Sequence, residues 1–91
     1  MLHPNMLHPR GGKRLANENE YPNIVELSVV GDGLEVELSR RIIDFHKSRH
    51  IQPRHGRTIN REGETYYRWC FADSATARAF LEQFGGTLCS N

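Results

Sequence analysis

Apolar and polar side chains alternate along residues 23–30 (NIVELSVV). One side of this stretch carries the aliphatic residues Val25, Leu27 and Val29. The other side carries Ile24, Glu26 and Ser28. A two-residue period rich in β-branched side chains is typical of a strand with one buried face. We therefore predict a first strand here, with ordered structure beginning near Tyr21.

A helical period follows the glycine-rich break at residues 31–33. Apolar side chains recur at intervals of three and four residues, at Leu34, Leu38, Ile42 and Phe45. Asp32 and Glu35 have the spacing of a capping box, so the pattern predicts a helix over residues 33–50. In the alternative interpretation, residues 34–38 form the second strand of a hairpin and the helix begins only after Ser39.

Residues 56–72 predict a β-hairpin. Its second strand carries an aromatic row, Tyr67, Trp69 and Phe71, and Ile59 is the only large apolar residue of its first strand. If Ile59 shares the buried side with this row, the loop must have an odd number of residues. Residues 61–63 fit a type I turn closed by a glycine bulge, so we expect a positive φ at Gly63.

A second helix is predicted after Asp73, which has the side chain of an N-cap. Its apolar stripe consists of Ala77, Phe80, Leu81 and Phe84. Gly85 stands where a helix ends in a left-handed cap, and residues 87–90 fit a final edge strand.

The predicted order is strand, helix, strand, strand, helix, strand. This order predicts an α+β fold, specifically a ferredoxin-like βαββαβ sandwich with a four-stranded antiparallel sheet of order 4-1-3-2 and both helices on one face. Cys70 and Cys89 then lie on strands two positions apart. That separation is about 9.5 Å, too far for a disulfide, so both are expected to be thiols.

Composition restricts the class of protein. The chain has 91 residues, of which 37% are hydrophobic, and a net charge of +1. We expect one domain over residues 21–91 behind a disordered tail at residues 1–20, where the tetrapeptide Met-Leu-His-Pro occurs twice. No apolar run approaches the roughly 20 residues that span a bilayer, so we expect no membrane partner and a cytoplasmic protein.

Positive charge is concentrated in residues 46–61, which carry five Lys and Arg and no acidic residue. Such a stripe can bind phosphates, although solvated basic faces are also common. The binding residues predicted on this basis are Lys47, Arg49, Arg54, Arg57, Tyr66 and Arg68.

Two resemblances concern the end of the chain. The run at residues 66–86, YYRWCFADSATARAFLEQFGG, loosely resembles the RNA-recognition motif, which implies base-stacking positions at Tyr66 and Arg68. Ile24, Glu26 and Ser28 stand where that family has a further aromatic residue on the first strand. The ending RWCFAD, an alanine-rich helix and Phe-Gly-Gly also looks like small uncharacterised bacterial proteins, a resemblance that implies no activity.

Three histidines are the main candidates for a metal site, and His3 and His8 are weaker ones. His46 and His50 are four residues apart on the predicted helix, and His55 follows in the loop. A His-x3-His pair can place two imidazoles on one side of a helix, but no fourth ligand has a suitable spacing. We therefore expect no metal or other cofactor, and surface histidines instead. No histidine is placed to activate Cys70 as a nucleophile, so no catalytic residue is predicted.

The remaining candidate is the open face of the sheet, whose residues include Glu26 and Arg68 on neighbouring strands. Its mixture of Tyr, Arg, Ile and Cys resembles a modest interface. The sequence favours a non-enzymatic binding domain that uses this face to form a homodimer or to bind a protein partner. The alternative is a nucleic-acid-binding module that uses residues 46–61, and a histidine-based metal protein is the third hypothesis.

Overall fold

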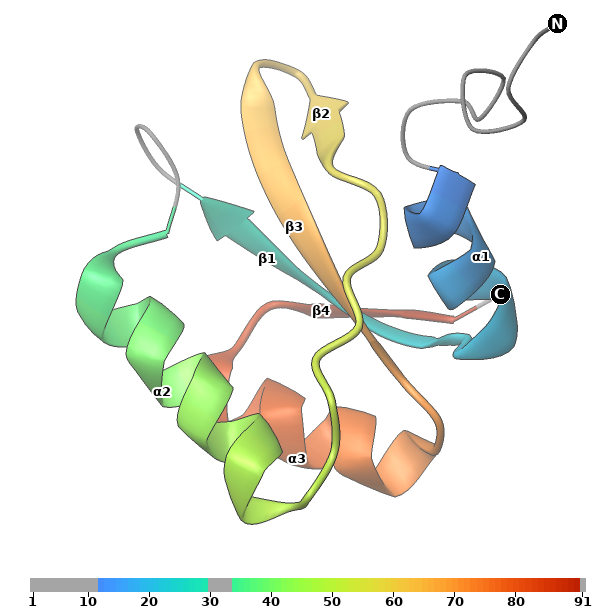
Figure 1. Cartoon of the computed structure of the whole chain (residues 1–91). Coiled ribbons are helices and arrows are strands. Elements are labelled where there is room, and N and C mark those ends of the chain that lie inside the picture. Colours follow the sequence, from blue (N-terminus) through green and yellow to red (C-terminus); the bar gives the residue numbers. More distant parts are fainter. Residues whose placement is uncertain (1–11, 30–33, 91) are drawn as a thin grey trace, which may run out of the picture.

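The computed structural model describes residues 12–29 and 34–90, which form a small α+β domain (Figure 1). Its elements are α1 (Gly12–Glu20), β1 (Asn23–Val29), α2 (Val36–Ser48), β2 (Ile59–Arg61), β3 (Glu64–Phe71), α3 (Ser74–Phe84) and β4 (Thr87–Ser90). The predicted α+β class and its four-stranded antiparallel sheet are confirmed.

The sheet has the strand order β2-β3-β1-β4. Counted from the opposite edge, the same sheet reads β4-β1-β3-β2. β1 lies between β3 and β4, and Ile24 has Cys70 opposite it on one neighbour and Cys89 on the other. Both cysteines are free, as the separation of their strands predicted.

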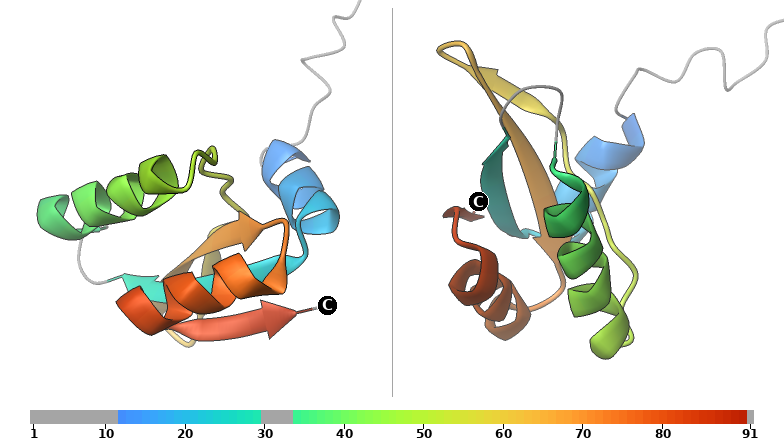
Figure 2. Two further views of the ribbon diagram at one scale, coloured as in Figure 1. Left: turned by 90° about the horizontal axis from the view of Figure 1, so that it is seen from below. Right: turned by 90° about the vertical axis from the view of Figure 1, so that its left-hand side faces the viewer.

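The apolar core fills the space between one face of this sheet and the pair α2 and α3 (Figure 2). The buried members come from four elements: Val25, Leu27, Ile42, Phe45, Trp69, Phe71, Ala77 and Phe80. The predicted inward aromatic row is confirmed, because Trp69 and Phe71 are buried and Tyr67 is half-buried against the same cluster.

Both predicted helices are present, with differences at their ends. The helical interpretation of residues 34–38 is confirmed over the strand alternative, but α2 begins only at Val36, and Glu35 at its N-cap makes no side-chain capping bond. Asp32, the residue predicted to cap it, lies outside the described residues. In α3 the predicted cap is confirmed, since the Thr76 N–H donates to the Asp73 carboxylate at 2.9 Å. Gly85 ends the helix with φ +80°.

The predicted hairpin loop was one residue too long. The turn contains only Glu62 and Gly63, with φ values of 55° and 83°, as a type I′ turn requires. Gly63 therefore has the expected positive φ, but Ile59 lies opposite Tyr66, on the side away from the helices. Ile59 lies outside the core because the two-residue turn aligns it with Tyr66 rather than with the inward aromatic row. Residues 54–56 pair with β3 in a register that differs by one residue, across a slip at residues 57–58.

The prediction of a disordered segment up to residue 20 is corrected for residues 12–20, which form α1. Residues 1–11 lie outside the described part of the chain. α1 packs on the sheet face opposite α2 and α3, and it is the element that turns this face into a candidate site (Figure 1).

Candidate functional site: the charged face of the sheet

Glu18 attaches α1 to the sheet. It is 2% exposed although it carries a carboxylate. Its Oε2 accepts a 2.6 Å hydrogen bond from the backbone N–H of Arg57, whose guanidinium reaches Oε1 at 2.9 Å. Arg68 on β3 donates to the same Oε1 at 3.0 Å. A buried carboxylate is stable only when its oxygens are paired in this way.

A second buried carboxylate continues the pairing across the sheet. Glu26 on β1 is 3% exposed and accepts from Nε of Arg68, on the adjacent strand, at 2.8 Å. Arg61 on β2 donates to both oxygens of Glu26, at 3.1 and 3.2 Å. The result is a continuous row, hereafter the charge ladder, in the order Arg57, Glu18, Arg68, Glu26 and Arg61.

The ladder keeps both acids ionised. Burial raises the pKa of Glu18 and of Glu26, but the hydrogen bonds and positive charges of the arginines outweigh it, so both pKa values fall below the ordinary 4.5. Three arginines and two glutamates leave the ladder with one net positive charge.

Gly56 makes room for the Glu18 carboxylate. A Cβ at position 56 would lie 2.8 Å from Glu18 Oε2 and 2.9 Å from the Cβ of Arg68. Its φ lies outside the left-handed region, so the requirement for glycine is space. The close approach of α1 to the edge of the sheet therefore depends on this position as well as on the ion pairs.

α1 covers only part of this face. The uncovered half carries an exposed or half-buried set: Ser28, Ile59, Arg61, Tyr66, Thr87 and Cys89. Arg61 is the ladder's outer end, with its side chain 50% exposed, and its guanidinium lies over the Tyr66 ring at 4.9 Å. The Tyr66 hydroxyl donates to Glu64 at 3.1 Å. The uncovered half thus presents a tyrosine ring, a guanidinium and an isoleucine side by side.

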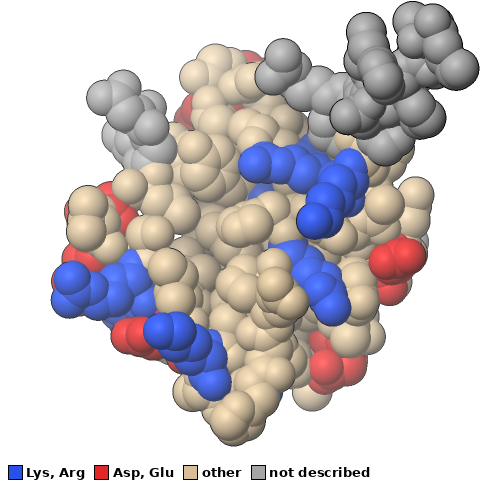
Figure 3. Space-filling view, viewed as in Figure 1, with Lys and Arg blue, Asp and Glu red and all other residues tan. Residues whose placement is uncertain are grey.

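The structure does not bring the six predicted binding residues together. Arg57 and Arg68 belong to the charge ladder, and Tyr66 lies two residues before Arg68 on the same side of β3. Lys47 and Arg49 lie at the end of α2, where the Arg49 guanidinium packs 3.9 Å from the Phe45 ring centre. Arg54 lies over the Tyr21 ring at 4.2 Å. Figure 3 shows basic side chains near α1 and the segment before β2, and a separate mixed-charge group over α2.

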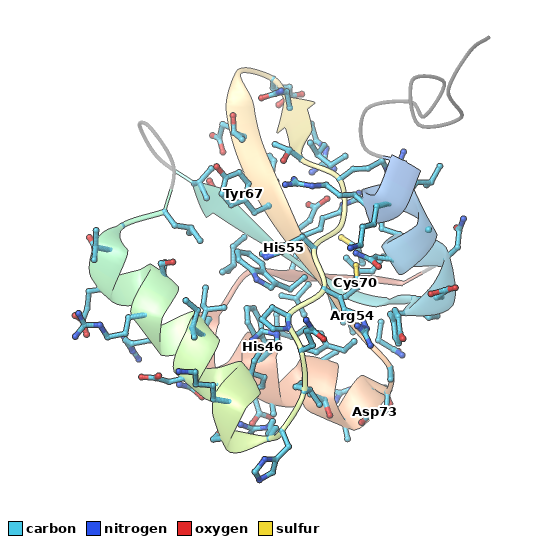
Figure 4. All side chains as sticks on the ribbon, in the orientation of Figure 1. His46, Arg54, His55, Tyr67, Cys70 and Asp73 are labelled. Carbon is cyan, nitrogen blue, oxygen red and sulfur yellow. The ribbon has the colours of Figure 1, made fainter. Side chains whose placement is uncertain are left out.

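The three candidate histidines do not come together, and the expectation that all of them lie on the surface is wrong for His46. His46 is a core residue, 1% exposed, whose Nδ1 lies 2.8 Å from the Ile42 carbonyl and donates to it, and whose ring stacks on Phe71. His50 lies beyond the end of α2 with a φ of 57°, so the helical spacing to His46 is lost. His55 is on the exposed segment against Trp69 (Figure 4). Among residues 12–29 and 34–90, no three His, Cys, Asp or Glu side chains are grouped to hold a metal ion.

The buried positions of His46 and Cys70 limit their chemistry. Burial lowers the pKa of His46, and nearby Arg49 lowers it further, against the opposing effect of the Ile42 bond. Burial and the charge of Glu18 raise the pKa of the Cys70 thiol to about 11, so it is protonated at neutral pH. The protonated Cys70 is not in the thiolate state that nucleophilic catalysis requires, and His46 is enclosed in the core, 1% exposed, where its ring does not face solvent.

Two cavities lie beside the segment that precedes β2. The larger, of about 360 Å³, lies between this segment and the start of α3 and is lined in part by Arg54, Cys70 and Asp73 (Figure 4). The smaller, of about 250 Å³, includes Arg14 and Tyr67. In the larger cavity the Thr76 hydroxyl donates to the Asp73 carboxylate at 2.8 Å, a contact that belongs to the N-cap of α3.

The sequence did not reveal the residues that build this face. Glu18 and Gly56 were not predicted to matter, and Arg61 was noted only as part of the basic segment. The one available signal in residues 12–20 was the density of helix-forming side chains around Leu15, a weak signal in so short a stretch.

No helix in the described ranges is long and apolar enough to cross a membrane. Comparison with protein-family models, with curated proteins and with solved structures found no match to the chain.

Proposed function

We propose that this chain is a non-enzymatic interaction domain that binds a protein partner through the uncovered half of the charged sheet face. The observation that carries the proposal is the ladder end: Arg61 is anchored to the buried Glu26, remains half exposed, and packs against Tyr66. Arginine and tyrosine are, with tryptophan, the side chains enriched at interface positions that dominate binding energy.

The ion pairs favour binding because they hold Arg61 in place before any partner arrives. A long side chain normally loses rotamer freedom when it is immobilised in an interface, at a cost of about 0.5–1.5 kcal/mol. Here the two hydrogen bonds to Glu26 have already restricted Arg61. Half of its side chain remains available for further contacts.

The charge of the ladder favours a partner with a carboxylate. A two-fold homodimer through this face would bring two copies of the same net positive ladder together. Like charges across an interface oppose association, whereas an acidic group is attracted to Arg61. A different protein that presents acidic and apolar side chains fits this face better than a second copy does.

Amide NMR titration with two synthetic peptides tests the proposal. In the first, glutamate alternates with leucine; in the control, lysine replaces glutamate. We expect the acidic peptide alone to shift the amides of β2, β3 and β1 around Tyr66. Tyr66→Ala and Arg61→Glu should each weaken its binding by about tenfold, whereas Arg40→Glu, on the exposed side of α2, should leave it unchanged.

Equal binding of both peptides, or shifts confined to α2, would contradict the proposal. The same titration with single-stranded RNA covers the nucleic-acid alternative. That alternative draws support from Lys47, Arg49 and Arg54, which make no ion pair with a described acidic residue. Salt-sensitive shifts around these three residues would favour it.

We also propose the finer assignment of the fold, a ferredoxin-like sandwich to which α1 has been added, in a cytoplasmic protein. Support for the fold comes from the order of elements after α1 and from the packing of α2 and α3 against one face. The added helix narrows the open face of that fold to the half around Tyr66.

A further inference from the structure

We propose that a second copy of this chain pairs with the free edge of β4, so that two sheets join into one across a two-fold axis. This contact lies at the edge of the sheet and does not depend on the face around Tyr66. Two features of the molecule support this contact: the difference between the two sheet edges and the charges of α3.

The β2 edge is protected against pairing. The slip in register at residues 57–58 interrupts it, and Arg57 and Arg61 project from it. α1 also covers part of it, because the Asn17 side chain donates to the outward carbonyl of His55 at 2.9 Å. Bulges, charged side chains and covering elements are the devices by which proteins prevent edge strands from pairing.

The β4 edge has none of these devices within the described residues. β4 pairs with β1 along its whole length without a slip. Its sequence, Thr-Leu-Cys-Ser, carries no charge and no proline. Alternate residues of an antiparallel edge strand direct N–H and C=O groups away from the sheet, and no described residue pairs with them on that side. Leu88 adds an aliphatic side chain that is 39% exposed.

A second copy of the chain fits this edge because it brings the same unpaired strand. Two identical antiparallel strands satisfy each other's outward groups about a two-fold axis perpendicular to the sheet. Because β4 is uncharged, the pairing brings no like charges together within the strands. The same axis places the two α3 helices side by side and antiparallel, since α3 runs along β4 (Figure 2).

The charges on α3 complement each other in that arrangement. Thr76 faces the loop after α2, where it lines a cavity with His50. Arg78 lies about 200° further round the helix, and so faces the β4 side. Glu82, one turn later, is on the same flank, and both side chains are exposed. In antiparallel helices, Arg78 of each copy meets Glu82 of the other.

Sedimentation equilibrium of the full chain over a wide concentration range tests the contact. We expect a reversible dimer. Arg78→Glu and Glu82→Arg should each raise the dimer dissociation constant by about tenfold, because each creates two like-charge pairs. The double variant with both exchanges should restore the wild-type value. Leu88→Lys should weaken the dimer as edge lysines do, and Arg40→Glu and Tyr66→Ala serve as controls that leave it intact.

A chain that stays monomeric at every concentration would overturn the proposal, as would a dimer that Leu88→Lys does not weaken. A dimer weakened by Leu88→Lys but unaffected by the α3 exchanges would support edge pairing and remove the helix contact. If Tyr66→Ala abolished the dimer while Leu88→Lys left it unchanged, the second copy would bind to the sheet face and not to the β4 edge. The two α3 variants change exposed positions, so they also separate loss of pairing from loss of folding.

Discussion

The two faces of the sheet are buried by opposite means. Beneath α2 and α3, aromatic and aliphatic side chains fill the space, and the Phe80 ring packs against Phe45, Trp69, Phe71 and Phe84. On the other face, a single short helix is fixed by carboxylates and guanidinium groups with few apolar contacts. The first face is held by area removed from water, and the second by hydrogen bonds of defined direction.

This difference separates stability from specificity. Apolar burial is non-directional and supplies most of the free energy of folding. A buried ion pair contributes little net stability, because desolvation consumes much of the attraction, yet removal of one partner is costly. We infer that the face beneath α2 and α3, hereafter the helix-covered face, holds the domain together. The charge ladder determines where α1 lies on the other face and which half of that face stays open.

The largest effect is expected from Phe80→Ala on the helix-covered face. Phe80 is fully buried, and its truncation should lower the free energy of unfolding by about 4 kcal/mol. That loss is a large part of the total for a domain of this size. Urea unfolding followed by Trp69 fluorescence measures it. Gln83→Ala, at an exposed position on the same helix, should cost little, and an equal cost for both would contradict the role assigned to the core.

A smaller and more local effect is expected from Glu18→Ala. Removing this carboxylate leaves Arg57 without its partner and Arg68 with Glu26 alone. The cost should be about 3 kcal/mol, at the low end for a broken buried pair, because the Arg57 side chain is 47% exposed. Hydrogen exchange should accelerate in residues 12–20 while amides of β1 and β3 stay protected.

Glu20→Ala is the matched control for this variant. Glu20 is on the same helix but exposed, so its removal should leave exchange in α1 nearly unchanged. If Glu18→Ala instead accelerated exchange throughout the sheet, the two faces would not be separable, and α1 would have to be counted as part of the central core.

The same difference explains what the sequence could predict. The residues of the helix-covered face repeat with the period of the element that carries them. Alternation in β1 and three- and four-residue spacing in α2 and α3 therefore predicted Val25, Ile42 and Phe80 as core residues from the sequence alone. Packing against an apolar core produces such a period in the sequence, because most inward positions must be apolar. His46 was wrongly expected on the surface, because it lies at the inward position four residues after Ile42 but carries a polar ring.

The residues of the charged face do not recur at regular intervals in the sequence. Glu18 and its partners Arg57 and Arg68 are about forty to fifty residues apart in the chain, and a charged side chain in a polar segment normally predicts a solvated surface. Ile59 was misplaced for a related reason: the register slip at residues 57–58 changes which side a residue faces. Contacts that depend on a bulge, or on ion pairs between residues distant in the chain, cannot be predicted from the sequence pattern.

The smallest effects are expected from pH, which should affect the two faces in turn. The pKa of His46 in the folded state lies below its ordinary 6.5, so stability is complete above pH 6.5 and is lost as the pH falls through that value. The pKa values of Glu18 and Glu26 are lowered from 4.5, so their contribution is lost only below about pH 4.5. Acid should therefore weaken the helix-covered face first.

Urea unfolding between pH 8 and about pH 3 measures this order. The free energy of unfolding should decline below pH 6.5 with a slope of at most about 1.4 kcal/mol per pH unit for each histidine. Desolvation of its ring and the charge of Arg14 also lower the pKa of His55, so this group titrates in the same window. His46→Gln should remove most of the slope and His55→Gln only a minor part, because His46 is the buried ring. If His55→Gln had the larger effect, the acid response would belong to the exposed segment before β2, and the helix-covered face would carry no titrating group of consequence.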